Sequence, residues 1–135
     1  MKGKPLPRVT EVTRPYWDAA RAGRFVIQRC GRCRRFVHYP RPWCPHCWST
    51  ELDWVEASGR GEVVTYTAVH QAPSPAFAVG APYVLAVVRL AEGPQMMANV
   101  VHIQPREMRV GLPVRVTFEE REGGFRVPQF EPATG

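Results

Sequence analysis

The sequence has only two lysines, no long apolar run and no cysteine outside one short motif. Its longest purely apolar stretch covers residues 83–88, far fewer than the about 20 residues that a transmembrane helix needs. The first twelve residues contain no apolar run, so they predict no secretion signal. We therefore expect a cytoplasmic protein that has no membrane partner.

Recognisable catalytic motifs are also absent. Because every cysteine belongs to the same motif, no thiol remains to act as a nucleophile. No serine lies in a nucleophile elbow, and no glycine-rich phosphate loop occurs. The four histidines are scattered without a partner pattern for general base catalysis. The sequence thus predicts no catalytic residue in this chain and no catalytic activity of the chain alone.

Positive charge is concentrated in the first half of the chain. Residues 1–60 carry a net charge of +7, whereas residues 61–135 carry −1. This asymmetry favours an anionic partner, such as nucleic acid, the phosphates of a cofactor or an acidic protein face. Two causes that need no partner stay open as well. A metal bound by four thiolates carries about −2, which neighbouring arginines would partly offset. The excess of arginine also fits a compositional bias, with 16 Arg in the chain.

The first half predicts a short helix and a strand that leads into the cysteine motif. Residues 13–23 form the helix, with Thr13 as a cap, Pro15 in the first turn and Gly23 at the end. A helix of this length is marginal alone and has to pack on the rest of the chain or on a partner. Residues 24–29 form the strand, and the cysteine segment continues to about residue 48.

From residue 52 onward the apolar period is two, which indicates several short strands. Residues 83–90 are apolar on both faces and predict a central strand, and Gly123-Gly124 predicts a hairpin turn. One helical turn is expected at 105–108, before a strand at 113–119. The pattern predicts a mainly β protein with an N-terminal helix and a small closed barrel of the OB type, with a small sandwich as the rival. We expect the helix and ribbon in residues 1–50 and the barrel in 51–135.

The cysteines form a motif that predicts a metal site in the first half of the chain. Two C-x-x-C pairs, ten residues apart, present four thiolates at the spacing that a tetrahedral metal–sulfur site needs: Cys30, Cys33, Cys44 and Cys47. Two disulfides fit poorly without a secretion signal, and two redox pairs so close together are not expected. We predict one structural metal ion and favour zinc over iron. Four thiolates leave no open coordination position, so the ion should not activate water.

Further motifs along the chain resemble a known family. They are Pro15-Tyr16-Trp17, Gly23, Gln28-Arg29-Cys30-x-x-Cys33, Tyr39-Pro40-Arg41-x-x-Cys44-Pro45-x-Cys47, Ser58-Gly59-Arg60-Gly61, Pro82-Tyr83, Gly111-x-Pro113-Val114 and Pro128-x-Phe130-x-Pro132. Together they resemble a widespread prokaryotic family of zinc-ribbon plus OB-fold proteins linked to acyl-CoA metabolism, long a domain of unknown function. The resemblance extends from about residue 14 to residue 132.

This resemblance implies an N-terminal helix, a rubredoxin-like zinc ribbon and a five-stranded OB-fold barrel. It also implies a partner subunit of a thiolase-fold enzyme: a thiolase, a hydroxymethylglutaryl-CoA synthase or a retro-aldolase that shortens steroid side chains. In such complexes the active residues belong to the thiolase-like subunit, and the zinc-ribbon protein acts as a scaffold or helps to shape the acyl-CoA pocket. A coenzyme A thioester at the interface is therefore expected.

Candidate contacts to acyl-CoA or the partner follow from the chemistry of coenzyme A. Arginine forks suit its phosphates, and aromatic side chains suit its adenine or acyl chain. The predicted contacts are Tyr16, Trp17, Arg35, Arg41, Trp43 and Phe77. Phe77 lies in a proline-rich loop at 71–82, which we expect at the edge of the pocket or partner contact.

Two other functions remain open at the level of sequence. Zinc ribbons and OB barrels both hold nucleic acid in other proteins, and the first half is basic. Against this, residues 61–135, which make up most of the predicted barrel, carry a net charge of −1, which suits nucleic acid poorly. The second alternative is a stand-alone acyl-CoA-binding protein without an enzyme partner.

Overall fold

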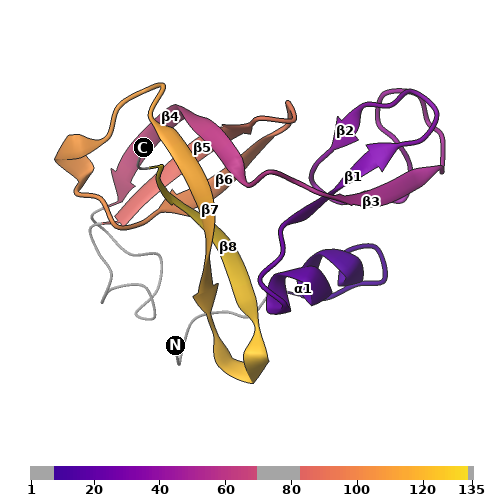
Figure 1. Ribbon diagram of the computed structural model, residues 1–135, viewed down its shortest axis with the longest axis horizontal. Coiled ribbons are helices and arrows are strands. Elements are labelled where there is room, and N and C mark those ends of the chain that lie inside the picture. The colour runs from indigo at the N-terminus through magenta and orange to yellow at the C-terminus, as the bar shows by residue number, and fades with distance from the viewer. Residues whose placement is uncertain (1–7, 70–82, 134–135) are drawn as a thin grey trace.

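A computed structural model of the chain describes residues 8–69 and 83–133, which form a small lobe and a barrel (Figure 1). The small lobe holds the helix α1 (Arg14–Arg21) and the strands β1 (Val26–Cys30), β2 (Phe36–Val37) and β3 (Leu52–Glu56). The barrel holds β4 (Arg60–Val69), β5 (Tyr83–Leu90), β6 (Gln95–Val100), β7 (Pro113–Glu120) and β8 (Arg126–Pro132). Two 3₁₀ turns, η1 (Pro105–Glu107) and η2 (Glu122–Gly124), lie on either side of β7.

Helix α1 begins and ends where the sequence predicts, but its cap differs. Pro15 lies in its first turn, and Gly23 follows its end with a φ of 75°. The hydroxyl of Thr13 does not cap the helix, so that prediction was wrong. Instead it accepts the Thr10 amide at 2.9 Å, because the side chains of Thr10 and Thr13 bond to each other. In the described part of the chain, no helix is long and apolar enough to cross a membrane.

The small lobe contains an antiparallel sheet in the order β2–β1–β3. β3 begins just after the division expected at residue 50 and pairs with β1 along its whole length. The buried side chain of Gln28 extends this sheet. Its amide nitrogen donates to the Arg41 carbonyl at 2.9 Å, and its amide oxygen accepts from the Arg41 N–H at 2.7 Å. Gln28 therefore fixes the backbone of Arg41 as a neighbouring strand would.

The barrel is closed in the order β4–β5–β6–β8–β7, with β7 pairing back to β4. This confirms the predicted OB-fold over the sandwich. β5 pairs with β4 on one side and β6 on the other, but its fully buried residues alternate along the strand, so the predicted burial of both faces was wrong. The register between β4 and β5 shifts between Val63 and Thr65. Gly61 is needed at the start of β4, because a Cβ there would meet the Arg89 carbonyl oxygen at 2.6 Å.

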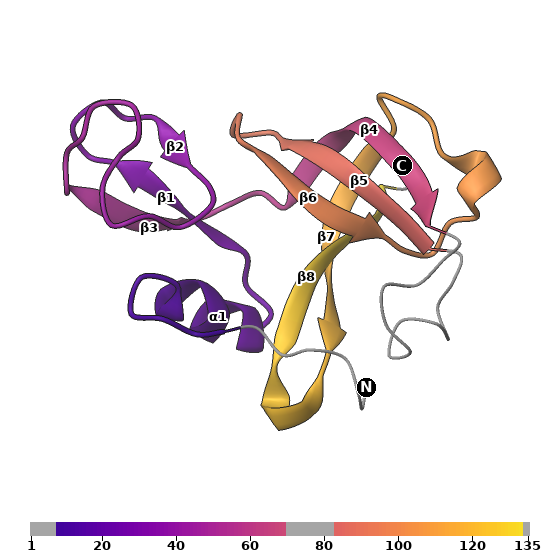
Figure 2. The same ribbon diagram turned by 180° about the vertical axis from the view of Figure 1, so that it is seen from behind.

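The two lobes share one hydrophobic core. Tyr16, Phe25 and Ile27 of the small lobe pack with the buried residues of the barrel, of which Phe130 is the largest. A second, much smaller cluster lies at the outer end of the small lobe, where Val37 packs with the cysteines and Leu52. In both views the β5–β6 turn extends from the barrel toward the ribbon strands, and the β7–β8 hairpin extends past one end of α1 (Figures 1 and 2).

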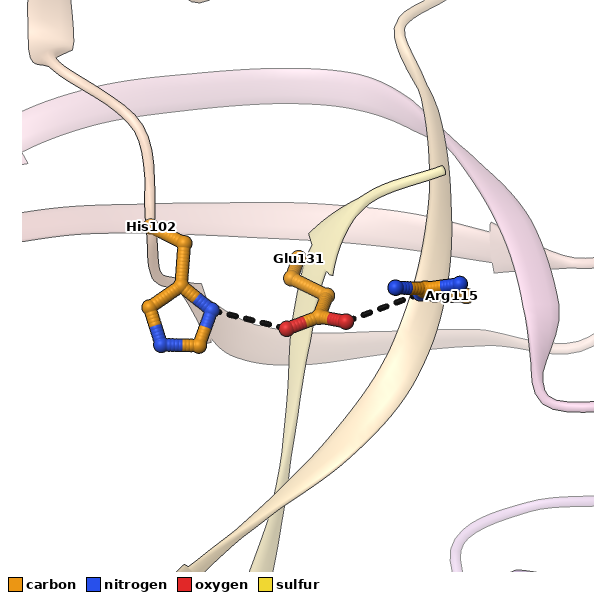
Figure 3. Close-up of polar contacts among 3 residues, drawn as sticks. All are labelled: His102, Arg115 and Glu131. Atoms are coloured by element: carbon orange, nitrogen blue, oxygen red, sulfur yellow. Dashed lines mark hydrogen bonds and ion pairs between the residues drawn. The ribbon is translucent and has the colours of Figure 1, made fainter. Parts of the chain in front are cut away.

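One charged cluster reinforces the seam at which the barrel closes. β6 and β8 are parallel there and share a single register pair, Val100 with Phe130. Just beyond it, the Glu131 carboxylate accepts from Arg115 Nε at 2.8 Å, and its other oxygen lies 2.7 Å from His102 Nδ1 (Figure 3). Glu131 thus connects the ends of three strands. Both hydrogen bonds also hold its pKa below the usual range.

We expect Glu131→Gln to lower the free energy of unfolding by about 1 kcal/mol near neutral pH. Because the pKa of Glu131 is lower in the folded state, its stabilisation is present above the unfolded pKa of about 4.3 and is lost as the pH falls through the folded value. Urea titrations at several pH values should therefore show the two proteins converging in acid. Glu120→Gln is the control, because that side chain is 77% exposed. A difference that grows in acid would contradict the role of Glu131.

Candidate metal centre and adjoining clefts

The four cysteine sulfurs converge at the outer end of the small lobe. They come from two tight turns, or knuckles: the first contains Cys30 and Cys33, and the second contains Cys44 and Cys47. All four sulfurs lie within 4.8 Å of one another. The Sγ atoms of Cys30 and Cys47 are 3.5 Å apart, and those of Cys33 and Cys44 are 3.6 Å apart. All four thiols are free, so the structure contains no disulfide among them.

The two knuckles repeat one backbone pattern. In the first, the N–H of Arg34 donates to the Cys30 carbonyl at 2.9 Å; in the second, the N–H of Trp48 donates to the Cys44 carbonyl at 2.8 Å. Arg34 and Trp48 occupy equivalent positions, and both have the left-handed backbone, with φ of 65° and 68°. Backbone amides also point at the sulfurs. The N–H of Cys33 lies 3.4 Å from Cys30 Sγ, and that of His46 lies 3.4 Å from Cys44 Sγ.

These amides favour the ionised form of two thiols. The N–H of Cys33 lowers the pKa of Cys30 to about 6, although burial opposes it. Burial also opposes ionisation of Cys44, but the N–H groups of His46 and Cys47 outweigh it and lower its pKa. At Cys33 the N–H of Arg35 lowers the pKa, but burial and the neighbouring sulfurs outweigh this effect and raise the pKa to about 11. A cation among the four sulfurs would favour the thiolate at each of them.

The sulfur positions fit a single tetrahedral ion. Metal–sulfur bonds of about 2.3 Å give neighbouring sulfurs a separation of about 3.8 Å, close to the two short distances here. Such a shell is closed, so an ion held there would stabilise the fold and bind no substrate. The imidazole of His46 lies exposed at the surface beside the second knuckle.

A basic cleft of about 440 Å³ lies between the ribbon and the β5–β6 turn. Arg35 and Arg41 line it from the segment between the knuckles, and Glu92, Gly93 and Pro94 line it from the barrel. Both arginines are exposed, and the backbone of Arg41 is fixed by Gln28. Two guanidinium groups at one cleft can together bind an anion such as a phosphate.

An apolar groove of about 310 Å³ lies on the other side of the same segment. Its walls come from α1, the ribbon, β6 and the β7–β8 hairpin, and include Tyr16, Trp17, Met96, Met97, Val127 and Pro128. Tyr16 and Trp17 pack edge to face, with ring centroids 4.9 Å apart. The exposed Tyr39 also lines the groove, and its hydroxyl accepts the Met97 N–H at 2.8 Å.

His38 lines both the basic cleft and the apolar groove. Its ring lies among Tyr16, Phe25 and Tyr39, and both ring nitrogens are buried without a hydrogen-bond partner in the described part of the chain. Burial lowers the pKa of His38 to about 4, so the imidazole is neutral near pH 7. The sequence did not single out this residue, because no partner residue lies near it along the chain.

The predicted contact residues fall into separate places. Arg35 and Arg41 line the basic cleft, and Tyr16 and Trp17 line the apolar groove. Trp43 lies on the second knuckle, where it stacks on Trp48 with ring centroids 6.3 Å apart. Phe77 and the loop at 71–82 lie outside the described residues. The roles of these residues in binding remain predictions. Sequence reasoning missed His38, Trp48 and the methionines of β6.

Comparison with known proteins agrees with this architecture. Residues 17–53 match the ChsH2 rubredoxin-like zinc ribbon domain, and residues 54–119 match the ChsH2 C-terminal OB-fold domain. A "DUF35 domain-containing scaffold protein" of Pyrococcus furiosus is 37% identical over 123 residues, which cover 89% of this chain and 85% of the relative. This chain belongs to the ChsH2/DUF35 family. The family resemblance seen in the sequence is therefore confirmed.

Other relatives of the ChsH2/DUF35 family carry enzyme names. A "Probable enoyl-CoA hydratase alpha subunit" of Thermomonospora curvata is 40% identical over 130 residues, or 96% of this chain. The present chain spans only 40% of the length of that relative. A chain in the structure titled "Ltp2-ChsH2(DUF35) aldolase" superposes with a TM-score of 0.86 and 40% identity, over 96% of this chain and 100% of that chain.

Proposed function

We propose that the chain is a non-catalytic accessory subunit that binds a thiolase-like enzyme and helps to form its acyl-CoA site. The thiolase-like enzyme is a thiolase, a hydroxymethylglutaryl-CoA synthase or a retro-aldolase. One observation carries the proposal: the basic cleft and the apolar groove adjoin at His38. An acyl-CoA has the same division, because its phosphates lie at one end and its acyl chain at the other.

The chemistry of each cleft suits one end of this ligand. The guanidinium groups of Arg35 and Arg41 can form charge-assisted hydrogen bonds with the phosphates. The rings of Tyr16 and Trp17, with Met96 and Met97, offer an apolar wall to an acyl or pantetheine chain. Both clefts are open at the surface, so a partner protein could complete them. The ligand would then be shared between the two subunits.

The chain has no cysteine outside the metal centre, which supports an accessory role. Its four cysteines are the four sulfurs of the metal centre. The catalytic groups would therefore come from the partner. The names of the relatives point the same way, since they describe a scaffold protein, a hydratase subunit and a chain of an aldolase complex.

We further propose that the metal is zinc and that its role is structural. Four thiolates in a tetrahedral arrangement suit Zn²⁺, with iron as the alternative for the same donor set. The small cluster around Val37 and Leu52 supplies little apolar burial to the outer ribbon. The ion would hold Cys30, Cys33, Cys44 and Cys47 together and thereby keep the segment with Arg35 and Arg41 in place.

The test is to purify the zinc-loaded chain with the thiolase-like subunit of the same host and to titrate the complex with acyl-CoA. We expect the double variant Arg35→Ala, Arg41→Ala to lower acyl-CoA affinity by about 10- to 100-fold while the complex still forms. For acyl-pantetheine, which lacks the adenosine phosphates, the double variant and the wild type should have nearly equal affinity. Arg109→Ala is the matched control, since Arg109 is exposed beyond η1 and lines neither cleft.

Other outcomes would replace this proposal. Acyl-CoA binding by the chain alone, without any stable complex, would favour a stand-alone acyl-CoA-binding protein. Tight and strongly salt-dependent binding of nucleic acid, with no binding of the thiolase-like subunit, would favour the nucleic-acid function.

A further inference from the structure

A tryptophan occupies a position in the second knuckle that suits its backbone poorly. Trp48 has a φ of 68°, a left-handed conformation that is unfavourable for a bulky side chain and free of strain for glycine. Trp48 is nevertheless 72% exposed. Trp48 thus gains little from packing within the chain, although its backbone is strained.

The first knuckle shows that this position does not require an aromatic residue. Arg34 occupies the equivalent position, with a φ of 65° and the same backbone hydrogen bond to the preceding knuckle cysteine. Arg34 is exposed as well, and its knuckle presents its cysteines equally well to the metal centre. Folding of the second knuckle therefore does not explain why residue 48 is tryptophan.

Trp48 forms an exposed aromatic pair with Trp43. The two rings stack with an interplanar angle of 23°, and Trp43 is itself 45% exposed. The residues that line the basic cleft and the apolar groove do not include either ring. The pair is therefore a separate apolar surface at the outer end of the ribbon, and tryptophan is the residue most enriched among those that dominate protein–protein binding energy.

The segment that contains this aromatic pair is rich in positive charge. Residues 19–50 contain seven arginines and no aspartate or glutamate. Arg32 and Arg34 on the first knuckle are both exposed and line neither the basic cleft nor the apolar groove. The metal centre would offset only part of this charge, since a four-thiolate zinc site carries about −2. An apolar contact with a basic rim is complementary to a surface that has carboxylates around an apolar recess.

We propose that Trp43 and Trp48 are the anchor of a docking surface for an acidic protein face, and that the occupant is the thiolase-like subunit. This inference rests on the proposed function and adds to it the place and the chemistry of the contact. A protein suits this surface better than a nucleic-acid strand. The two rings stack on each other, whereas a strand needs separate rings along a groove for successive bases.

The substitution Trp48→Gly tests whether Trp48 serves partner binding or the stability of the fold. Glycine relieves the left-handed strain, so we expect the thermal midpoint of the variant to be equal to or above that of the wild type. Binding of the purified thiolase-like subunit, measured by calorimetry or interferometry, should weaken by at least about 30-fold. Val110→Ala is the control, because Val110 is 66% exposed on the barrel side and should leave affinity unchanged.

The outcomes distinguish this inference from the proposed function. If the wild type binds the subunit and Trp48→Gly binds it equally well, the docking surface is wrong and the accessory function stands. If the wild type does not bind the subunit, both are wrong. A marked fall in the thermal midpoint of Trp48→Gly would show that Trp48 is structural. If a single-stranded oligonucleotide binds the wild type and not the variant, the occupant is nucleic acid and the inference is overturned.

Discussion

Cys44→Ser should release the metal and unfold the ribbon while the barrel stays folded. The ion can contribute on the order of 10 kcal/mol to folding, and the outer ribbon has only the small cluster around Val37 and Leu52 to replace it. Metal content by mass spectrometry should fall to background. Hydrogen exchange should show that the amides of residues 30–50 lose protection, whereas those of β5 and β6 keep it.

His46→Ala is the matched control for this variant. His46 lies between Cys44 and Cys47 in sequence, but its side chain is exposed, so its loss should leave the metal content unchanged. Titration of the wild type with a strong chelator should reproduce the exchange pattern of Cys44→Ser. A Cys44→Ser protein that kept one ion per chain with native affinity would refute the assignment of four sulfur ligands.

Phe130→Ala should be the most damaging substitution in the barrel. Phe130 is fully buried, it pairs with Val100 at the seam, and its ring packs edge to face on Phe25 at 6.4 Å. Loss of a buried phenylalanine side chain costs about 3–5 kcal/mol, through lost burial and the cavity that remains. We expect the urea midpoint to fall accordingly, with both lobes affected because the ring contributes to their shared core.

Phe125→Ala provides the comparison for Phe130→Ala. Phe125 is partly exposed next to η2, and its main contact is the guanidinium of Arg21, 4.2 Å from the ring centroid. A cation–π contact at such a site contributes about 0.5–1 kcal/mol. Equal losses for the two phenylalanines would contradict the large contribution to stability that we assign to Phe130.

The parts of the fold that the sequence predicts are those encoded by local spacing. The two C-x-x-C pairs specify the sulfur cluster, and the period-two segments after residue 52 specify the strands. The structure also has the predicted turn between β7 and β8 at Gly123-Gly124 and the predicted helical turn before β7. Each of these signals is formed by residues close together in the chain, so it can be recognised without knowing the tertiary structure.

The sequence analysis did not predict the features that depend on residues far apart in the chain. The parallel contact of β6 with β8 joins Val100 to Phe130, and nothing in either strand specifies its partner. The Thr13 cap was a sound local expectation that failed because Thr10 competes for the same hydroxyl. The position of His38 between two clefts depends on the packing of α1, the ribbon and the barrel. Exposure of Trp48 follows from the knuckle geometry, which the motif alone does not reveal.

The ten residues between the two knuckles contain Arg35, His38, Arg41 and Trp43. The basic cleft, the junction of the two clefts and part of the exposed aromatic pair therefore all depend on a segment that is anchored at both ends by metal ligands. Thermodynamic linkage then works in both directions. If this segment binds an anion or a partner, that binding would raise the affinity of the four cysteines for their ion, and the supply of the ion would set how many molecules can bind the anion or the partner. Metal availability would thus act as a concentration control on assembly, without any change in the amount of the protein.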